Sequence, residues 1–93
     1  MKPRRPHPIE SLNEHFVRLV RGPGCYGDGN GLYLKVDSTG AKRWILRTVI
    51  LGKRRDMGLG SLSTTSLAKA RQNAEWYRAI AREGGDPILV RHG

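Results

Sequence analysis

The stretch KRWILRTVILGKRRDMGLGS, residues 42–61, predicts a β-hairpin around which the rest of the fold can be built. On both sides of positions 51–52, apolar and polar side chains alternate, which is the pattern of strands with one buried face. Gly52 can adopt the positive φ that a two-residue hairpin turn requires. A turn at this point sets Ile50 opposite Lys53, and this pair fixes the register of the whole hairpin.

This register sorts the side chains of the hairpin into two faces. The expected pairs are Leu46 with Met57 and Trp44 with Leu59 on the apolar face, and Arg47 with Asp56 and Val49 with Arg54 on the other. A slip of one residue would turn every side chain to the opposite face. The hairpin is therefore expected to offer one apolar face to a core and to expose arginines on the other.

A third strand is expected at residues 32–36, LYLKV, joined to the hairpin by a turn at 37–41. Gly27, Gly29 and Gly31 precede this strand and look at first like a phosphate-binding loop. Such a loop stands between a strand and the N-terminus of a helix, whereas these glycines stand before a strand. We therefore expect them to turn the chain tightly into the strand.

The N-terminal part combines a basic segment with a short helical pattern. Residues 1–8 hold three prolines and three cations, so we expect a flexible basic arm. Beyond the arm, apolar residues recur three to four positions apart, which predicts an amphipathic helix that ends before the GPG of 22–24. The apolar positions of this helix are Ile9, Leu12, Phe16 and Leu19 or Val20.

A longer helix is expected over residues 66–83. The hydroxyl-rich segment STTS at 63–66 supplies capping side chains, and Gly84 and Gly85 end the helix. The chain is expected to continue in an extended conformation at Asp86–Pro87. Alanines in the apolar stripe of the helix permit a close approach to a sheet. The residues of this stripe are Leu67, Ala70, Ala74, Tyr77 and Ala81.

Together these segments predict an α+β fold: a three-stranded antiparallel sheet packed on one C-terminal helix, with a short N-terminal helix. A single covering helix leaves one face of the sheet open. Threonine, lysine, glutamate and glutamine are usual on a wet sheet face, but here arginines alternate with aliphatic residues and a tyrosine. The expected members of the open face are Tyr33, Lys35, Arg43, Ile45, Arg47, Val49, Arg54 and Asp56.

The charge of the chain favours an anionic partner. Seventeen lysines and arginines against eight aspartates and glutamates give a formal net charge of +9. A chain so charged repels itself, which favours nucleic acid over a merely solvated basic surface. The major groove of B-DNA is about 12 Å wide and admits a small sheet. The open face therefore favours duplex DNA over an alternative in which its cations only discourage aggregation between strands.

Other chemistries find little support in the sequence. His7, His15 and His92 share no metal-ligand spacing, and the calcium-like start at Asp28 and Asn30 lacks the later ligands of such a loop. No nucleophile stands in a catalytic context. We therefore expect no catalytic residue, no metal and no cofactor.

The redox and membrane signals point to the cytoplasm. Cys25 is the single cysteine and can form no internal disulfide, which fits a reducing compartment. Because no apolar run reaches the length of a membrane span, no membrane partner is expected.

Five segments in order carry a resemblance to a known family: YGDGNGLYLKV, GAKRWILR, GKRRDMGLGS, SLAKAR and GGDP, between residues 16 and 87. They are similar to the N-terminal arm-type DNA-binding domain of tyrosine recombinases, the integrases of phages and genomic islands. The resemblance implies sequence-specific binding of the sheet in the major groove of arm-type attachment sites. The chain departs from the family at Leu62 and Ser63, where an aromatic residue and a proline are usual, and at 48–50.

The resemblance also implies a domain plan. Residues 9–87 correspond to the arm-type DNA-binding domain, and residues 88–93 to the start of a linker. Core-binding and catalytic domains would follow in the parent recombinase. The chain itself is then a non-catalytic module, not an enzyme, and is expected at the nucleoid in the bacterial cytoplasm.

Roles can be assigned to the expected DNA-binding residues. Arg43 and Arg47 suit base edges, and Asp56 either holds Arg47 or accepts from a cytosine amine. The cations expected at phosphates are Lys35, Lys42, Lys53 and Arg54. The resemblance implies DNA contacts for Lys35, Arg43, Arg47, Arg54 and Arg55, although the register turns Arg55 toward the helix side. The full expected set is Tyr33, Lys35, Lys42, Arg43, Ile45, Arg47, Lys53, Arg54, Arg55 and Asp56.

Two other functions stay open at this point. In a protein-interaction module, Ile45 and Val49 would contact other integrase protomers or an excision factor. RNA binding is the weaker alternative, because readers of RNA usually stack two or three bases on aromatic residues and the open face offers only Tyr33.

Overall fold

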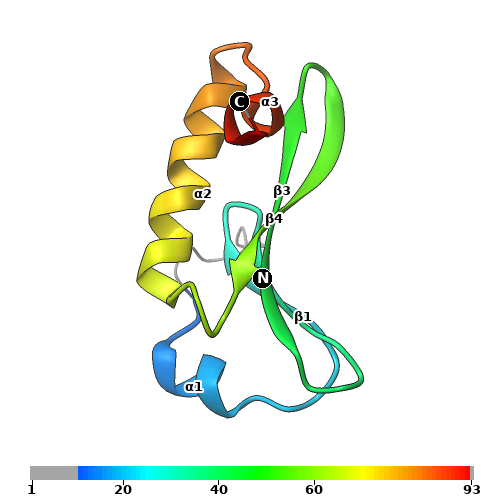
Figure 1. Ribbon diagram of the computed structural model, residues 1–93, viewed down its shortest axis with the longest axis vertical. Coiled ribbons are helices and arrows are strands. Elements are labelled where there is room, and N and C mark those ends of the chain that lie inside the picture. Colours follow the sequence, from blue (N-terminus) through cyan, green and yellow to red (C-terminus); the bar gives the residue numbers. More distant parts are fainter. Residues whose placement is uncertain (1–10, 93) are drawn as a thin grey trace, which may run out of the picture.

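The computed structural model describes residues 11–92, with the side chains of residues 11–90. Figure 1 shows the helices on one side of a single sheet. The expected arm at 1–8 lies outside the described residues. In chain order the elements are α1 (Glu14–Leu19), β1 (Gly24–Gly29), β2 (Leu32–Val36), β3 (Lys42–Ile50), β4 (Lys53–Ser61), α2 (Leu67–Arg82) and α3 (Pro87–His92).

The sheet is an antiparallel meander of four strands in the order β1-β2-β3-β4, so the prediction of three strands is wrong. The extra strand is β1, formed by the glycine-rich segment that was expected to be a turn. Gly29 pairs with Leu32 across a two-residue turn in which Asn30 and Gly31 have φ values of 54° and 86°. Asparagine followed by glycine is a strong hairpin signal, but glycines supply no apolar alternation that would mark a strand.

Gly31 is required by its surroundings as well as by its φ. A Cβ atom at this position would lie 2.2 Å from the carbonyl oxygen of Arg47. The backbone of Arg47 also donates its N–H to the carbonyl of Gly31, at 2.7 Å. This contact locks the β1–β2 turn against β3.

The register of the β3–β4 hairpin agrees with the prediction from the turn to the middle of the strands. Four expected pairs are present: Ile50 with Lys53, Val49 with Arg54, Arg47 with Asp56 and Leu46 with Met57. The expected pair of Trp44 with Leu59 is wrong, because an irregularity next to Trp44 shifts its partner to Gly60. Such a β-bulge inserts an extra residue, and Gly60 accommodates it with a φ of 108°.

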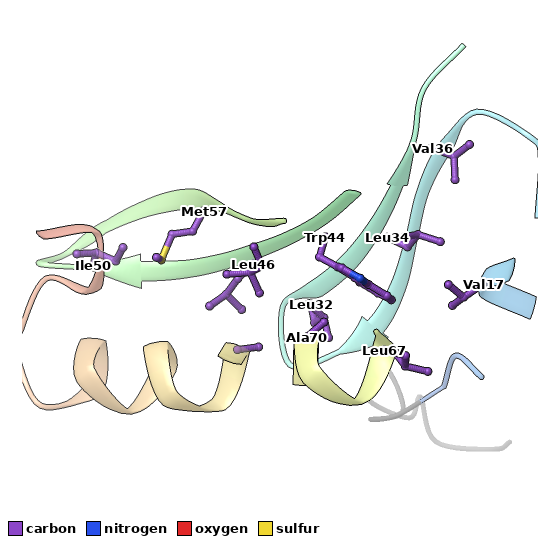
Figure 2. Packing of buried hydrophobic residues seen from close by; sticks show 12 residues of the cluster. Val17, Leu32, Leu34, Val36, Trp44, Leu46, Ile50, Met57, Leu67 and Ala70 are labelled. Atoms are coloured by element: carbon purple, nitrogen blue, oxygen red, sulfur yellow. The ribbon is translucent and has the colours of Figure 1, made fainter. Parts of the chain in front are cut away.

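The core lies between the sheet and α2. Trp44 is fully buried, and its ring stands between the strands and the helix (Figure 2). Its Nε1 atom donates to the carbonyl of Thr65 at 2.8 Å, so the buried indole is satisfied. The predicted stripe of α2 is confirmed: Leu67, Ala70 and Ala74 are buried and the rest of the stripe packs partly against the core.

The N-terminal helix is shorter than predicted and buries a different residue. α1 begins at Glu14, because the side chain of Asn13 caps it by accepting from the N–H of Phe16. Leu12 therefore precedes the helix, and Ile9 lies outside the described residues. Val17 is the buried residue of α1, whereas Phe16, an expected core position, is 39% exposed.

The end of α2 follows the prediction, but the segment after it does not. Gly84 and Gly85 donate to the carbonyls of Ala81 and Ile80, which terminates the helix as a Schellman motif. The chain then forms α3 where an extended segment was expected. Asp86 caps this helix by accepting from the N–H of Ile88 at 2.9 Å, and proline is well suited to a first helical position.

Candidate nucleic-acid interface

The face of the sheet opposite α2 carries most of the predicted site. The register places Tyr33 beside Ile45 and Lys35 beside Arg43 on this face. The β3–β4 pairs Arg47–Asp56 and Val49–Arg54 complete the row. In the described chain, residues 11–92, the helices pack on the other side (Figure 1). We call this surface the open face.

The strand that sequence reasoning missed extends the open face by one row. Cys25 lies beside Lys35, and Gly27 lies beside Tyr33. Cys25 is exposed. The signal that could have found this row is the Asn30–Gly31 dipeptide, which marks a hairpin turn and therefore a strand ahead of it.

Arg47 and Asp56 form a salt bridge with two hydrogen bonds on the open face. The guanidinium donates from Nε to Oδ1 of Asp56 at 2.9 Å and from Nη2 to Oδ2 at 3.3 Å. These hydrogen bonds lower the pKa of Asp56 and raise the pKa of Arg47 from their ordinary values. The Cζ atom of Arg47 also lies 5.3 Å from the centre of the Tyr33 ring, within the range of a cation–π contact.

The remaining cations of the predicted set are divided between the two sides of the sheet. Arg43 and Arg54 are exposed on the open face. Lys53 lies opposite Ile50 and Arg55 lies opposite Thr48, so both alternate to the helix side while remaining exposed near the end of the hairpin. They are therefore placed beside the open face and not on it.

Lys42 has a structural role that the sequence did not indicate. Its ammonium donates to the carbonyls of Val17 and Arg18 at 2.9 and 2.8 Å. These are carbonyls of the last turn of α1, where a cation is favourable for the helix dipole. Lys42 thus ties β3 to α1 on the side of the sheet opposite Arg47 and Arg43.

Gly58 is a feature of the open face that sequence reasoning missed. It pairs with Ile45, and its φ is not in the positive range. A Cβ atom at Gly58 would meet nothing within 4 Å. Neither the backbone nor the packing of the domain therefore requires glycine here, and such a glycine in a strand is typical of close approach by a partner.

A second arginine–aspartate pair lies away from the open face. Asp28, at the end of β1, is nearly buried and accepts from Nε and Nη2 of Arg71 on α2, both at 2.9 Å. The same carboxylate accepts from the N–H of Leu12, and Arg71 donates to the carbonyl of Leu12. This network joins the N-terminal segment, β1 and α2.

In residues 11–92, no helix combines the length and the apolar character needed to cross a membrane.

A sheet with helices on one face and arginines on the other is the arrangement expected of a DNA-binding domain of the β-sheet type. The model of the Arm DNA-binding domain family matches residues 12–92. The chain belongs to this family, and the resemblance noted from its sequence is confirmed.

Two curated relatives share this segment. The integrase of Shigella phage Sf6 and the prophage integrase IntS of Escherichia coli K12 are each 41% identical to the chain over 64 residues. The alignment covers 69% of this chain but only 17% of each relative. The similarity therefore concerns one domain of a much longer protein.

Proposed function

We propose that this domain binds duplex DNA at arm-type sites by placing the open face of its sheet in the major groove. One observation carries the proposal: the helices pack on the far side of the sheet, and the side chain of Arg47 is 45% exposed on the near side. The groove is about 12 Å wide, which suits a small sheet.

The positions of the cations suit such a complex. Lys35 and Arg43 lie side by side toward one end of the open face, and Arg54 lies near the β3–β4 turn at the other end. Two phosphate backbones border the major groove, so cations at the two ends can each meet one of them. Arg47 lies between these ends and is the residue we assign to base edges.

Residues at the end of the hairpin extend the phosphate contact. Lys53 and Arg55 are exposed there, beside Arg54. Gly58 leaves a flat place next to Ile45 where base edges can approach the backbone of β4. Lys42 is excluded from the proposed interface because its ammonium binds α1.

The proposed context is a site-specific integrase in which this domain is a non-catalytic module. The two relatives named as integrases support this context, and the chain covers 17% of each. In the proposal, strand cleavage and joining belong to other parts of the parent protein. The domain fixes that protein to DNA beside the site of recombination.

The test is binding of the chain to short duplexes at increasing salt. Affinity is expected to fall steeply between about 50 and 200 mM salt, because phosphate contacts release counterions. Arg47→Ala is expected to weaken binding of the preferred site by about 10- to 100-fold. Arg82→Ala is the matched control, since it removes the same charge from an exposed position on α2. Equal losses in the two variants would contradict the assignment of the open face.

Val49 gives the alternative function its support, since this side chain is 58% exposed on the open face. A protein partner, such as another protomer or an excision factor, could bury it together with Ile45. Self-association that ignores salt and needs no DNA would favour this alternative over the proposal.

A further inference from the structure

The guanidinium of Arg47 is held along one edge and lies over an aromatic ring. Asp56 accepts from Nε and Nη2, which form the side edge of the group. The Cζ atom of Arg47 also lies over the ring of Tyr33, 5.3 Å from the ring centre. A guanidinium carries five N–H donors in a rigid planar fork. With the side edge bound to Asp56, the parallel N–H groups of Nη1 and Nη2 at the outer end point away from the carboxylate.

We propose that this outer end reads one guanine and that Asp56 is the positioning residue that aims it, an inference that rests on the proposed function. Guanine presents two acceptors, O6 and N7, next to each other in the major groove, which two parallel donors match. Adenine offers an acceptor beside a donor, thymine a single acceptor and cytosine a donor. The orientation of Arg47 therefore selects guanine among the four bases.

Holding the side chain before binding reduces the freedom that it loses in the complex. An arginine side chain is long and has many rotamers, and the entropy lost when it is ordered opposes association. Asp56 holds the side edge of the guanidinium and Tyr33 contacts its Cζ atom, so the side chain is held from two sides in the free domain. Such preorganisation increases the difference between a matching and a non-matching base.

The negative charge of Asp56 affects DNA affinity in a direction that can be measured. Its carboxylate is 50% exposed on the open face, and the charges of Arg47, Arg54 and Lys35 all act to lower its pKa. A negative charge there opposes binding to any DNA. Removing it should therefore raise affinity for unrelated sequences while reducing the preference for guanine. A merely stabilising ion pair would leave the preference for guanine unchanged, so the loss of that preference is the result that distinguishes a positioning role.

The experiment begins with selection of a preferred site from a library of randomised duplexes, using the whole 93-residue chain. Each guanine of that site is then replaced singly by 7-deazaguanine, which keeps base pairing but lacks the N7 acceptor. One position is expected to cost the wild type about 5- to 100-fold in affinity. At that position Arg47→Ala is expected to show no further loss. Arg47→Lys and Asp56→Asn are expected to show smaller losses than the wild type, because a lysine can still donate to N7 but lacks the planar fork. Asp56→Asn is also expected to bind an unrelated duplex more tightly than the wild type.

Two results would overturn the inference while leaving the proposed function intact. One is full guanine discrimination in Asp56→Asn. The other is an Arg47→Ala variant that weakens all duplexes equally and keeps the penalty for 7-deazaguanine. Absence of duplex binding by the wild type at low salt would instead overturn the proposed function and the inference together. Because both side chains are half exposed, the variants are expected to fold. Circular dichroism of each variant verifies this.

Discussion

The two arginine–aspartate pairs of this domain share one geometry and differ in their surroundings. In each pair the arginine Nε lies 2.9 Å from a carboxylate oxygen. Asp28 has 3% of its side chain exposed and Arg71 has 29%, whereas Asp56 and Arg47 have 50% and 45%. A buried ion pair supports the fold because the loss of one partner costs much more stability there than in an exposed pair. An exposed pair contributes little to stability, so Arg47 and Asp56 are free to serve recognition.

The same division extends to the regions around the two pairs. Around Asp28, the backbone of Leu12 and the guanidinium of Arg71 use the carboxylate fully. Around Asp56, the neighbouring side chains are cations whose partners lie outside the domain in our proposal. The hidden side of the molecule is thus built for internal contacts, and the open face is built for an external one.

The largest expected effect is the loss of stability when the buried pair of Asp28 and Arg71 is broken. Asp28→Asn should lower the free energy of unfolding by on the order of 3 kcal/mol, because it removes the charge of a buried carboxylate that Arg71 and the N–H of Leu12 bind. For a domain of this size such a loss corresponds to a fall in Tm of roughly 12–24 °C. Asp56→Asn is the matched control and should change Tm little. Equal melting temperatures for the two variants, measured by circular dichroism, would contradict the claim that the buried pair stabilises the fold more than the exposed pair does.

A second contrast uses two glycines. Gly31→Ala places a Cβ atom against the carbonyl of Arg47 at a positive φ, so it should cost about 2 kcal/mol of stability. Gly58→Ala meets open space and should leave stability within about 0.5 kcal/mol.

The larger change Gly58→Leu should leave Tm nearly unchanged. It should lower duplex affinity by roughly 5- to 100-fold, because the leucine side chain would overpack the place where base edges are proposed to approach β4. Thermal melts and duplex titrations of these variants provide the measurement. Undisturbed DNA binding by Gly58→Leu would remove Gly58 from the proposed interface.

The smallest expected effect is a shift in titration. The hydrogen bond from Arg47 lowers the pKa of Asp56, and Arg54 and Lys35 act in the same direction. Because the folded pKa lies below the unfolded value of about 3.9, the contribution of Asp56 to stability is complete above that pH. It is lost as the pH falls through the folded pKa. Carboxyl NMR titration should show Asp56 moving to a higher pKa in Arg47→Ala, and an unchanged value would contradict the pairing.

Alternation predicted those parts of the fold in which side chains carry the information. The β3–β4 register and the stripe of α2 follow from apolar spacing alone, and so does the assignment of Arg47 and Asp56 to one face. β1 escaped because three of its positions near the turn are glycine or aspartate and show no apolar pattern. The shifted partner of Trp44 depends on a bulge at Gly60, which alternation cannot show.

The contacts between distant segments had no signal in the sequence. Arg71 and Asp28 are 43 positions apart, and nothing in either neighbourhood indicates their pairing. Lys42 was expected at phosphate because it stands near a turn, but its strand position turns it toward α1. α1 starts at Glu14 because Asn13 caps it. The apolar spacing that predicted an earlier start is a weaker signal than this cap.

The most direct test of the central claim is an NMR titration of the nitrogen-15-labelled domain with duplex DNA, observed at the arginine Nε–H groups. Arg47 and Arg71 both donate from Nε to an aspartate, so their signals report on equivalent bonds in the two regions. We expect the Arg47 signal to shift on addition of duplex and the Arg71 signal to stay in place. A stationary Arg47 signal, together with shifts confined to arginines of α2, would contradict the central claim.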